Sequence, residues 1–221
     1  MRAAGVGAST ASVQEARPSA SLRAALHSSA QFGRKDIIVR PVPYLIAKQM
    51  CERHHYLASY PGESVLNFGV FVANRLLGVA VLGAGPSNVH YFFEGAKAEQ
   101  VLCLSRCWLD DLLARNSESR VLAIILRHLR RYQTIIKAIV AYSDPMAGHS
   151  GIIYRAAGFL YLGQSTAMPG YMMPDGRVYH SRTLSHSFGT HSIAHFEAHD
   201  VRVESVPRVL KLIYVAFIDG A

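Results

Sequence analysis

The segments QVLCLSRCWL at residues 100–109, NSESRVLAIILRHLRRY at residues 116–132 and KAIVAYSDP at residues 137–145 decide the fold. The first and third are short apolar runs of the length expected for buried strands. The middle segment opens with residue types that cap helices and then repeats apolar residues at helical spacing. The repeated apolar residues are Val121, Leu122, Ile124, Ile125, Leu126 and Leu129. This order predicts a strand, a helix and a second strand, with the helix packed against the sheet.

The flanking sequence extends the same pattern. Apolar runs separated by the turn Ala73-Asn74-Arg75 predict a β-hairpin. Predicted strands cover residues 37–39, 65–72, 76–82, 159–162 and 201–217, and further predicted helices cover residues 43–51 and 152–157. We therefore predict an α/β fold with a mixed sheet flanked by helices.

The chain length of 221 residues suits one well-packed domain, which we place at residues 35–221. Residues 1–34 are rich in Ala, Ser and Arg, with Glu15 as the only acid. Such a segment buries little apolar surface and is predicted to be a disordered extension. Its composition also matches that of an organelle transit peptide.

The charge balance points to a polyanionic partner. The formal net charge is +8, although only 17 % of the residues are charged. Nucleic acid is the first candidate, an anionic membrane surface the second and a phosphorylated cofactor the third. A general solubilising role for the excess charge is the alternative.

The cysteines and the hydropathy pattern indicate a cytoplasmic protein, with no membrane as partner. Cys51, Cys103 and Cys107 are odd in number and form no C-x-x-C pair, which favours packing in a reducing compartment. No run approaches the roughly 18 to 20 apolar residues of a membrane span, and the N-terminus lacks an apolar signal-peptide centre.

Polar residues at the strand ends suggest a site. Arg106 near the end of one strand is costly to bury without a phosphate, a carboxylate or a structural acid such as Asp144. Asp144 follows the next strand, where it suits a general base or a helix cap equally. The helix start at residues 116–120 offers free backbone N–H groups to an anion, or is an ordinary capped helix.

The order of elements over residues 36–165 resembles the GNAT acyltransferase fold. In that fold, a Gly-rich loop at this position binds the cofactor pyrophosphate. Here residues 115–120 contain no glycine, and Glu118 adds a negative charge, which argues against acetyl-CoA as cofactor. The candidate cofactor-binding residues at this loop are Asn116, Ser117, Ser119 and Arg120.

Several short motifs spread over about residues 50 to 196 form a more specific set. They are HHYL (54–57), SYP (59–61), FGVF (68–71), LCLSRCWL (102–109), NSESR (116–120), YSDP (142–145), GH (148–149), HSRT (180–183) and FGTHS (188–192). In this order they resemble the Mom-like family, the phage type of DNA modification protein.

The resemblance implies an enzyme from a phage or prophage that converts adenine in DNA to a carbamoylmethyl derivative and protects the DNA from restriction. It implies that His55, Tyr56, Arg106, Ser119 and Asp144 matter for activity. It also raises iron as a cofactor, with His55 as a candidate metal ligand. The donor of the added group and the oligomeric state stay open, a dimer included.

An enzyme of this kind must take its adenine out of the duplex and stack it on aromatic residues. Candidates for stacking are Tyr56, Tyr60, Trp108 and Tyr142. Candidates for phosphate contacts are Arg127, Arg130, Arg131, Lys137 and Arg182, although a solvated helix face predicts several of the same residues.

Histidines cluster near the C-terminal end, and we expect a His-rich extension there. His191, His195 and His199 are spaced to share a helical face, which suits either a metal or a DNA-facing surface.

Two other functions fit the sequence. A CoA-dependent N-acyltransferase that modifies a small amine or a protein is the first. A basic DNA-binding module that has kept the fold without the chemistry is the second.

Overall fold

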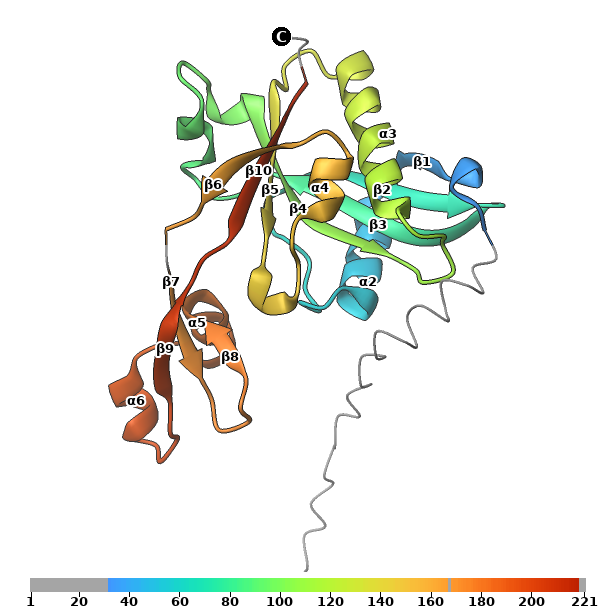
Figure 1. The fold of residues 1–221 in the computed structure, drawn as a ribbon. Coiled ribbons are helices and arrows are strands. Elements are labelled where there is room, and N and C mark those ends of the chain that lie inside the picture. The colour runs from blue at the N-terminus through green and yellow to red at the C-terminus, as the bar shows by residue number, and fades with distance from the viewer. Residues whose placement is uncertain (1–31, 167, 219–221) are drawn as a thin grey trace, which may run out of the picture.

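The computed structural model describes residues 32–166 and 168–218, which form two β-sheets with helices around them (Figure 1). The larger sheet has seven strands in the order β1-β2-β3-β4-β5-β10-β6, and the smaller has three in the order β8-β7-β9. The predicted disordered extension lies outside the described residues as far as residue 31.

The predicted strands and helices are present with ends that move by a few residues, except that the strand predicted over residues 201–217 is two strands, one in each sheet. The large sheet contains β1 (Ile38–Pro41), β2 (Ser64–Val72), β3 (Arg75–Gly83), β4 (Val101–Leu109), β5 (Ala138–Ser143), β6 (Leu160–Gln164) and β10 (Leu212–Phe217). The small sheet contains β7 (Met168–Met172), β8 (Val178–His180) and β9 (Glu204–Val209). The α-helices are α2 (Tyr44–His54), α3 (Ser117–Tyr132), α4 (Ile152–Ala156), α5 (Ser181–Phe188) and α6 (Ile193–Glu197). Four 3-10 turns complete the described elements: η1 (Arg34–Asp36), η2 (Val89–Phe92), η3 (Ala98–Gln100) and η4 (Pro145–Ala147).

The large sheet is mixed, as predicted. Neighbouring strands run antiparallel except β4 and β5, which are parallel because α3 connects them across one face. Helices α3 and α4 lie on one face of the sheet and α2 on the other (Figure 1).

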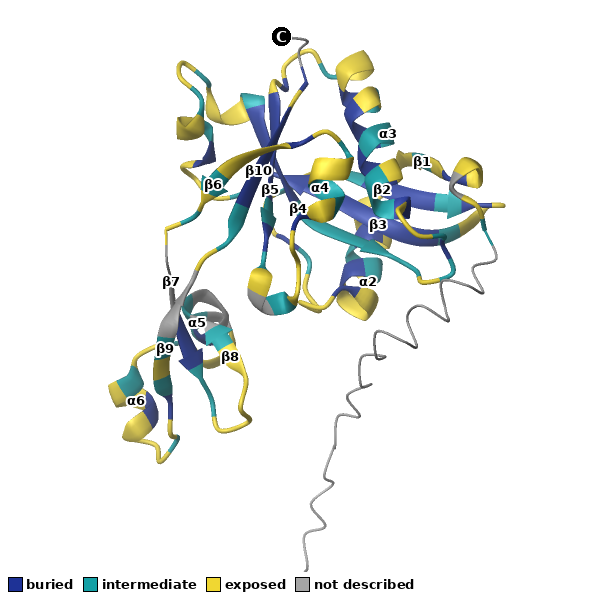
Figure 2. Ribbon diagram, viewed as in Figure 1, coloured by how far each residue is buried: buried dark blue, intermediate teal, exposed yellow. Residues whose placement is uncertain are grey.

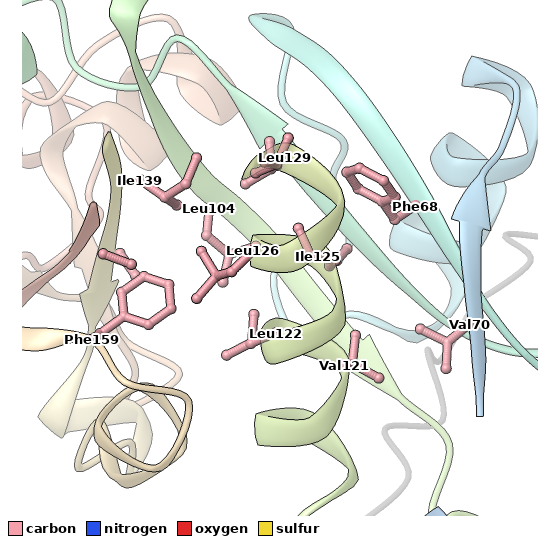
Figure 3. Packing of buried hydrophobic residues seen from close by; sticks show 14 of the residues in the cluster. Phe68, Val70, Leu104, Val121, Leu122, Ile125, Leu126, Leu129, Ile139 and Phe159 are labelled. Carbon is pink, nitrogen blue, oxygen red and sulfur yellow. The ribbon is translucent and has the colours of Figure 1, made fainter. Parts of the chain in front are cut away.

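Helix α3 supplies the largest part of the core. Its inward residues pack against side chains of β2, β4 and β5, and against Phe159 just before β6 (Figure 3). Its opposite face is exposed (Figure 2). The fully or nearly fully buried α3 residues are Val121, Leu122, Ile125, Leu126 and Leu129. The helical spacing of the sequence therefore identified the core face correctly, and only Ile124 is partly exposed.

The start of α3 is not capped by side chains, contrary to the prediction. Asn116 adopts a left-handed conformation with φ of 65°, and its side chain makes no capping bond. The Ser117 hydroxyl donates to the carbonyl of Ala114 at 2.5 Å, and that of Ser119 donates to the carbonyl of Asn116 at 3.0 Å. Both hydroxyls thus point back to carbonyls, and neither accepts a bond from a helix amide.

The histidine-rich segment is an insertion, whereas the sequence had suggested a C-terminal extension. The small sheet with α5 and α6 lies between β6 and β10 in the chain, and β10 then returns to pair with both β5 and β6. The insertion has its own core of Tyr171, Leu184, Phe196 and Val203.

The three histidines expected on one helical face do not share a helix, because α6 covers only Ile193–Glu197. His195 and His199 are neighbours, with ring centroids 4.4 Å apart. His191 instead hydrogen-bonds through Nδ1 to the hydroxyl of Ser185 at 2.7 Å. Separately, none of the helices in the described part of the chain is long and apolar enough to span a bilayer.

Candidate active site

A pocket opens in the large sheet where β4 and β5 part. The two parallel strands pair only from Val101 with Ala138 to Leu104 with Ala141. Beyond that point β4 stays paired with β3 as far as Leu109, and β5 stays paired with β10 as far as Ser143. The strands therefore diverge, and a cavity of about 220 Å³ lies between them. Such an opening at the carboxyl ends of parallel strands is a common ligand site in α/β folds.

A β-bulge at Ser105 aims Arg106 into this region. On β3, Val81 pairs with Arg106 while the next residue, Leu82, pairs with Leu104, so Ser105 has no opposite residue. The extra residue shifts the alternation of side chains along β4. Leu104 and Cys107 both pack in the core beneath α3. Arg106 is left on the other side, toward the loop that follows α2.

Arg106 holds that loop in place. Its Nε donates to the carbonyl of Ser59 at 3.0 Å, and its Nη2 donates to the Ser59 hydroxyl at 3.1 Å. Its Nη1 donates to the carbonyl of Ser105 at 2.7 Å. The guanidinium thus connects the end of β4 to the segment that carries His55 and Tyr56.

His55 is a buried side chain in the wall of the pocket, with 8 % of its surface exposed. Its Nδ1 accepts a hydrogen bond from the backbone N–H of Leu57 at 3.2 Å. Burial lowers the pKa of His55 to about 4, and the nearby charges of Arg106 and His149 act in the same direction. The imidazole is therefore neutral at physiological pH.

The loop after β5 forms the opposite wall. The carbonyl of Asp144 accepts the amides of Ala147 at 3.1 Å and His149 at 3.0 Å, which closes the loop into the 3-10 turn η4. The buried Ser143 hydroxyl donates to the carbonyl of His149 at 2.8 Å. The ring of His149 lies 5.4 Å from that of Tyr56, so the two walls approach each other there.

The remaining surface of the pocket includes phenol and thiol groups that stay protonated. Burial raises the pKa of Cys107 to about 12, with further contributions from Glu118 and Cys51. Burial, with Cys103 as a smaller cause, also raises the pKa of Tyr142 to about 12. The pKa of Tyr154 is raised for the same main reason. Neither the thiol nor the phenols are therefore ready nucleophiles at neutral pH.

Comparison with known families identifies the protein's relatives. The model of the Mom protein family matches residues 36–221, which is most of the chain. The chain belongs to the Mom protein family. Methylcarbamoylase mom of Escherichia phage Mu is 26 % identical over 156 residues, which cover 70 % of this chain and 64 % of the relative. The match thus spans slightly less than two thirds of the relative's length.

Solved structures share the fold of this Mom family member. An Arabidopsis thaliana NAA60 structure in complex with acetyl-CoA superposes with a TM-score of 0.52 at 10 % identity, over 83 % of this chain and 99 % of that one. The ribosomal-protein-S18-alanine N-acetyltransferase of Escherichia coli has a TM-score of 0.49 at 13 % identity, over 84 % and 96 %. The NAA60 likeness confirms the GNAT-like fold.

Four of the five residues expected to matter for Mom activity lie together. His55, Tyr56, Arg106 and Asp144 all line the pocket. The fifth, Ser119, lies in the first turn of α3 and does not line it. The other residues expected to bind a cofactor at that turn, Asn116, Ser117 and Arg120, do not line it either.

Of the four aromatic residues expected to stack a base, two line the pocket and two do not. Tyr56 and Tyr142 line the pocket. The hydroxyl of Tyr60 instead donates to Ser64 at 2.6 Å and Asn67 at 2.7 Å. Trp108 stacks on His54, with ring centroids 4.4 Å apart.

The residues expected to contact phosphate lie mostly at the other end of the sheet. Arg127, Arg130 and Arg131 are on the last turns of α3, about 20 Å along the helix from its start. Arg130 donates to the carbonyl of Phe217 at 2.9 Å. Lys137 precedes β5 at the same end, and the side chain of Arg182 lies outside the described residues.

The sequence interpretation missed several residues of the site. His149 and Tyr154 line the pocket, and Ser59 anchors Arg106. The motif GH at residues 148–149 contained a signal for His149, whereas no pattern indicated Tyr154 or the partnership of Ser59 with Arg106.

The described residues contain no group of three His, Cys, Asp or Glu side chains close enough to hold a metal ion. Iron as a cofactor stays an expectation from the family resemblance. The three cysteines are free, as expected.

Proposed function

We propose that this Mom family member is a DNA-modifying transferase that adds a carbamoylmethyl group to the exocyclic amine of adenine. The modification protects DNA from restriction endonucleases. The observation that carries the proposal is the convergence of Asp144, Arg106 and a neutral His55 in one pocket at the point where β4 and β5 part. The relationship to methylcarbamoylase mom supplies the substrate class.

The adenine amine is a weak nucleophile because its lone pair is delocalised into the ring. In the proposed step, the bond between N6 and the methylene carbon of the carbamoylmethyl group forms. The bond from that carbon to the leaving group of the donor breaks at the same time. The proton lost from N6 passes to the carboxylate of Asp144. The aromatic ring of Tyr56, which is 44 % exposed, offers a stacking surface for the extruded base.

Coenzyme A does not enter this mechanism. The loop before α3 lacks the glycines that a pyrophosphate loop uses, and Glu118 occupies the first helical turn. The left-handed Asn116 provides one backbone turn that a glycine would otherwise supply, yet the Ser117 and Ser119 hydroxyls are committed to backbone carbonyls. We therefore name the donor only as a molecule that carries carbamoylmethyl on a leaving group.

The net charge of +8 suits a DNA substrate. Arg53, two residues before His55, and Arg155, which follows Tyr154, are exposed, and we assign them to the phosphates beside the flipped base. The basic end of α3 lies about 20 Å along the helix from its start, and its residues do not line the pocket, so it suits more distant phosphates. An enzyme with this substrate acts in the cytoplasm of the bacterial host.

The test is to express the protein in bacteria and digest plasmid DNA to nucleosides for mass spectrometry. We expect a deoxyadenosine with the mass of one added carbamoylmethyl group, and resistance of the plasmid to restriction enzymes with adenine in their sites. Asp144→Asn and Arg106→Ala should abolish the new nucleoside while leaving the fold intact, as far-UV circular dichroism and cooperative thermal unfolding would show. An unchanged nucleoside profile from well-expressed, folded wild-type protein would contradict the proposal. An acetylated base or protein instead would favour a CoA-dependent acyltransferase.

A further inference from the structure

The hydrogen bond between Leu57 and His55 fixes the state of the buried imidazole. A backbone N–H can only donate, so the Nδ1 that accepts it at 3.2 Å carries no proton. In a neutral ring the proton then resides on Nε2. No partner for this Nε2–H is found among the described residues, although His55 is 92 % shielded from solvent and lines the pocket. A buried donor without a partner is costly, and a ligand in the pocket can satisfy it.

We infer that His55 donates a hydrogen bond from Nε2 to the ring nitrogen beside the reacting amine, and so acts as a residue that selects the base. The inference rests on the proposed function and deepens it. With Asp144 accepting from the amine and His55 donating to the adjacent nitrogen, the two walls of the pocket match the –N=C–NH₂ group of adenine.

The surroundings of His55 keep its imidazole neutral, with the proton on Nε2. Burial and the neighbouring Arg106 and His149 all disfavour the imidazolium, and Tyr56 covers one side of the ring at 4.5 Å between centroids. A ring with its proton on Nε2 has no lone pair there, so His55 cannot take the proton of the amine. That task stays with Asp144.

The arrangement also excludes the wrong purine. Guanine presents a carbonyl oxygen where adenine has its amine, and an N–H where adenine has the ring nitrogen N1. Guanine would therefore place an acceptor against the carboxylate of Asp144 whichever ring nitrogen His55 contacts, and, if that nitrogen is N1, also a donor against the donor of His55. Buried polar groups left unpaired in this way discriminate strongly between substrates. Cytosine shares the adenine pattern, so the size of the base must distinguish those two.

A pair of substitutions separates a donor from a base or a metal ligand. The amide nitrogen of glutamine can occupy the position of Nε2, whereas asparagine can reach only the position of Nδ1. We expect His55→Gln to retain DNA modification within about tenfold of the wild type, and His55→Asn to lose more than about tenfold beyond that. Equal loss in both folded variants would overturn the inference, because it indicates proton transfer or metal binding through His55.

Substrate analogues identify the acceptor. DNA with 1-deazaadenine or 7-deazaadenine at a modified site lacks one of the two ring nitrogens that flank the amine. With one of the two analogues, the wild type should modify DNA more slowly, by about the same factor as His55→Asn does with natural adenine. The same analogue should not slow His55→Asn any further, because that variant has already lost the contact. Full activity of the wild type on both analogues would contradict the proposed contact.

Nitrogen-15 NMR of histidine-labelled wild-type protein reports the tautomer without any assay of activity. We expect the His55 signals of a neutral ring with the proton on Nε2, assigned by comparison with His55→Gln. A proton on Nδ1 in protein that modifies DNA would defeat the inference while leaving the proposed function intact. Conversely, protein with the expected tautomer that leaves DNA unmodified would defeat both the proposed function and the contact with adenine.

Discussion

At the scale of single residues, the site depends on one strand irregularity and one tether. Without the bulge at Ser105, Arg106 would continue the alternation of Leu102 and Leu104 and point into the core beneath α3. The bulge turns it toward Ser59 instead, where two hydrogen bonds to Ser59 and one to the carbonyl of Ser105 hold the guanidinium. The strand β4 can therefore carry a charged residue, because the bulge directs the Arg106 side chain away from the core.

The first prediction at this scale concerns pH and stability. The pKa of His55 is about 4 in the folded state against 6.5 for an ordinary histidine. Between these values the unfolded chain binds a proton that the folded chain does not, so His55 makes the protein less stable as pH falls from 6.5 to 4. We expect the unfolding free energy of the wild type to fall more steeply than that of His55→Gln, by at most about 1.4 kcal/mol per pH unit.

The measurement is urea unfolding of both proteins between pH 4 and pH 8. Other histidines contribute to both curves, so only their difference reports His55. The difference should be flat above pH 7. Parallel curves over the whole range would show that His55 titrates normally in the folded protein.

At the scale of elements, α4 depends on a close approach between backbone and ring. Gly151 precedes the helix with φ of 72°, and a Cβ there would collide with the ring of Tyr214 on β10. The hydroxyl of Tyr214 donates to the carbonyl of Ser150 at 3.1 Å. The ring therefore sets the position of the segment that lines the pocket beyond His149.

Gly151→Ala should destabilise the protein by more than the backbone strain alone. Gly148 is a matched control, because it has a similar φ of 77° with nothing within 4 Å of its Cβ position. We expect thermal unfolding to show a cost of about 1 kcal/mol for Gly148→Ala and clearly more for Gly151→Ala. Equal costs would mean that Tyr214 moves aside without penalty.

Many of the helices and strands could be predicted from the sequence. The hairpin, α3 and the strands on either side of it follow from local periodicity, turn residues and runs of apolar residues. The bulge could not be predicted, since β4 is apolar on both faces and the alternation carries no phase. The insertion was also missed, because the pairing of β10 with β5 and β6 depends on residues about 50 to 80 positions apart, which local patterns do not encode.

Part of the candidate site could also be predicted from the sequence, and part of it could not. Arg106 and Asp144 were predictable as polar residues at strand ends, and His55 and Tyr56 followed from the family resemblance. The roles of Ser59, His149 and Tyr154 depend on loops that meet only in three dimensions. Ser119 was expected in the site because a helix start follows β4, yet the pocket opens along the strands and not at that turn.

At the scale of the whole molecule, two groups of exposed arginines are candidates for DNA contacts. Arg53 and Arg155 are near pocket residues in sequence, whereas Arg127 and Arg131 lie in the last turns of α3. Each phosphate contact contributes about 0.9 to the slope of log affinity against log salt concentration. A comparison of this slope between arginine variants therefore shows which arginines contact DNA.

We expect Arg53→Gln and Arg155→Gln each to reduce this slope by about one for a short duplex centred on the modified adenine. Arg127→Gln and Arg131→Gln should change the slope only when the duplex extends well beyond the modified adenine. Fluorescence anisotropy over a series of salt concentrations and duplex lengths gives the slopes. A dependence on Arg127 and Arg131 but not on Arg53 and Arg155 would place the DNA away from the pocket.

The short pairing of β4 with β5 also has a mechanical consequence. Four residue pairs join the unit β1-β2-β3-β4 to the unit β5-β10-β6, and the inserted small sheet is attached to the second unit alone. A slight twist of one unit against the other would widen or narrow the pocket between β4 and β5. The strand pairings within each unit would stay intact. Because the pocket lies at this seam, we expect ligand binding to change the angle between the two units.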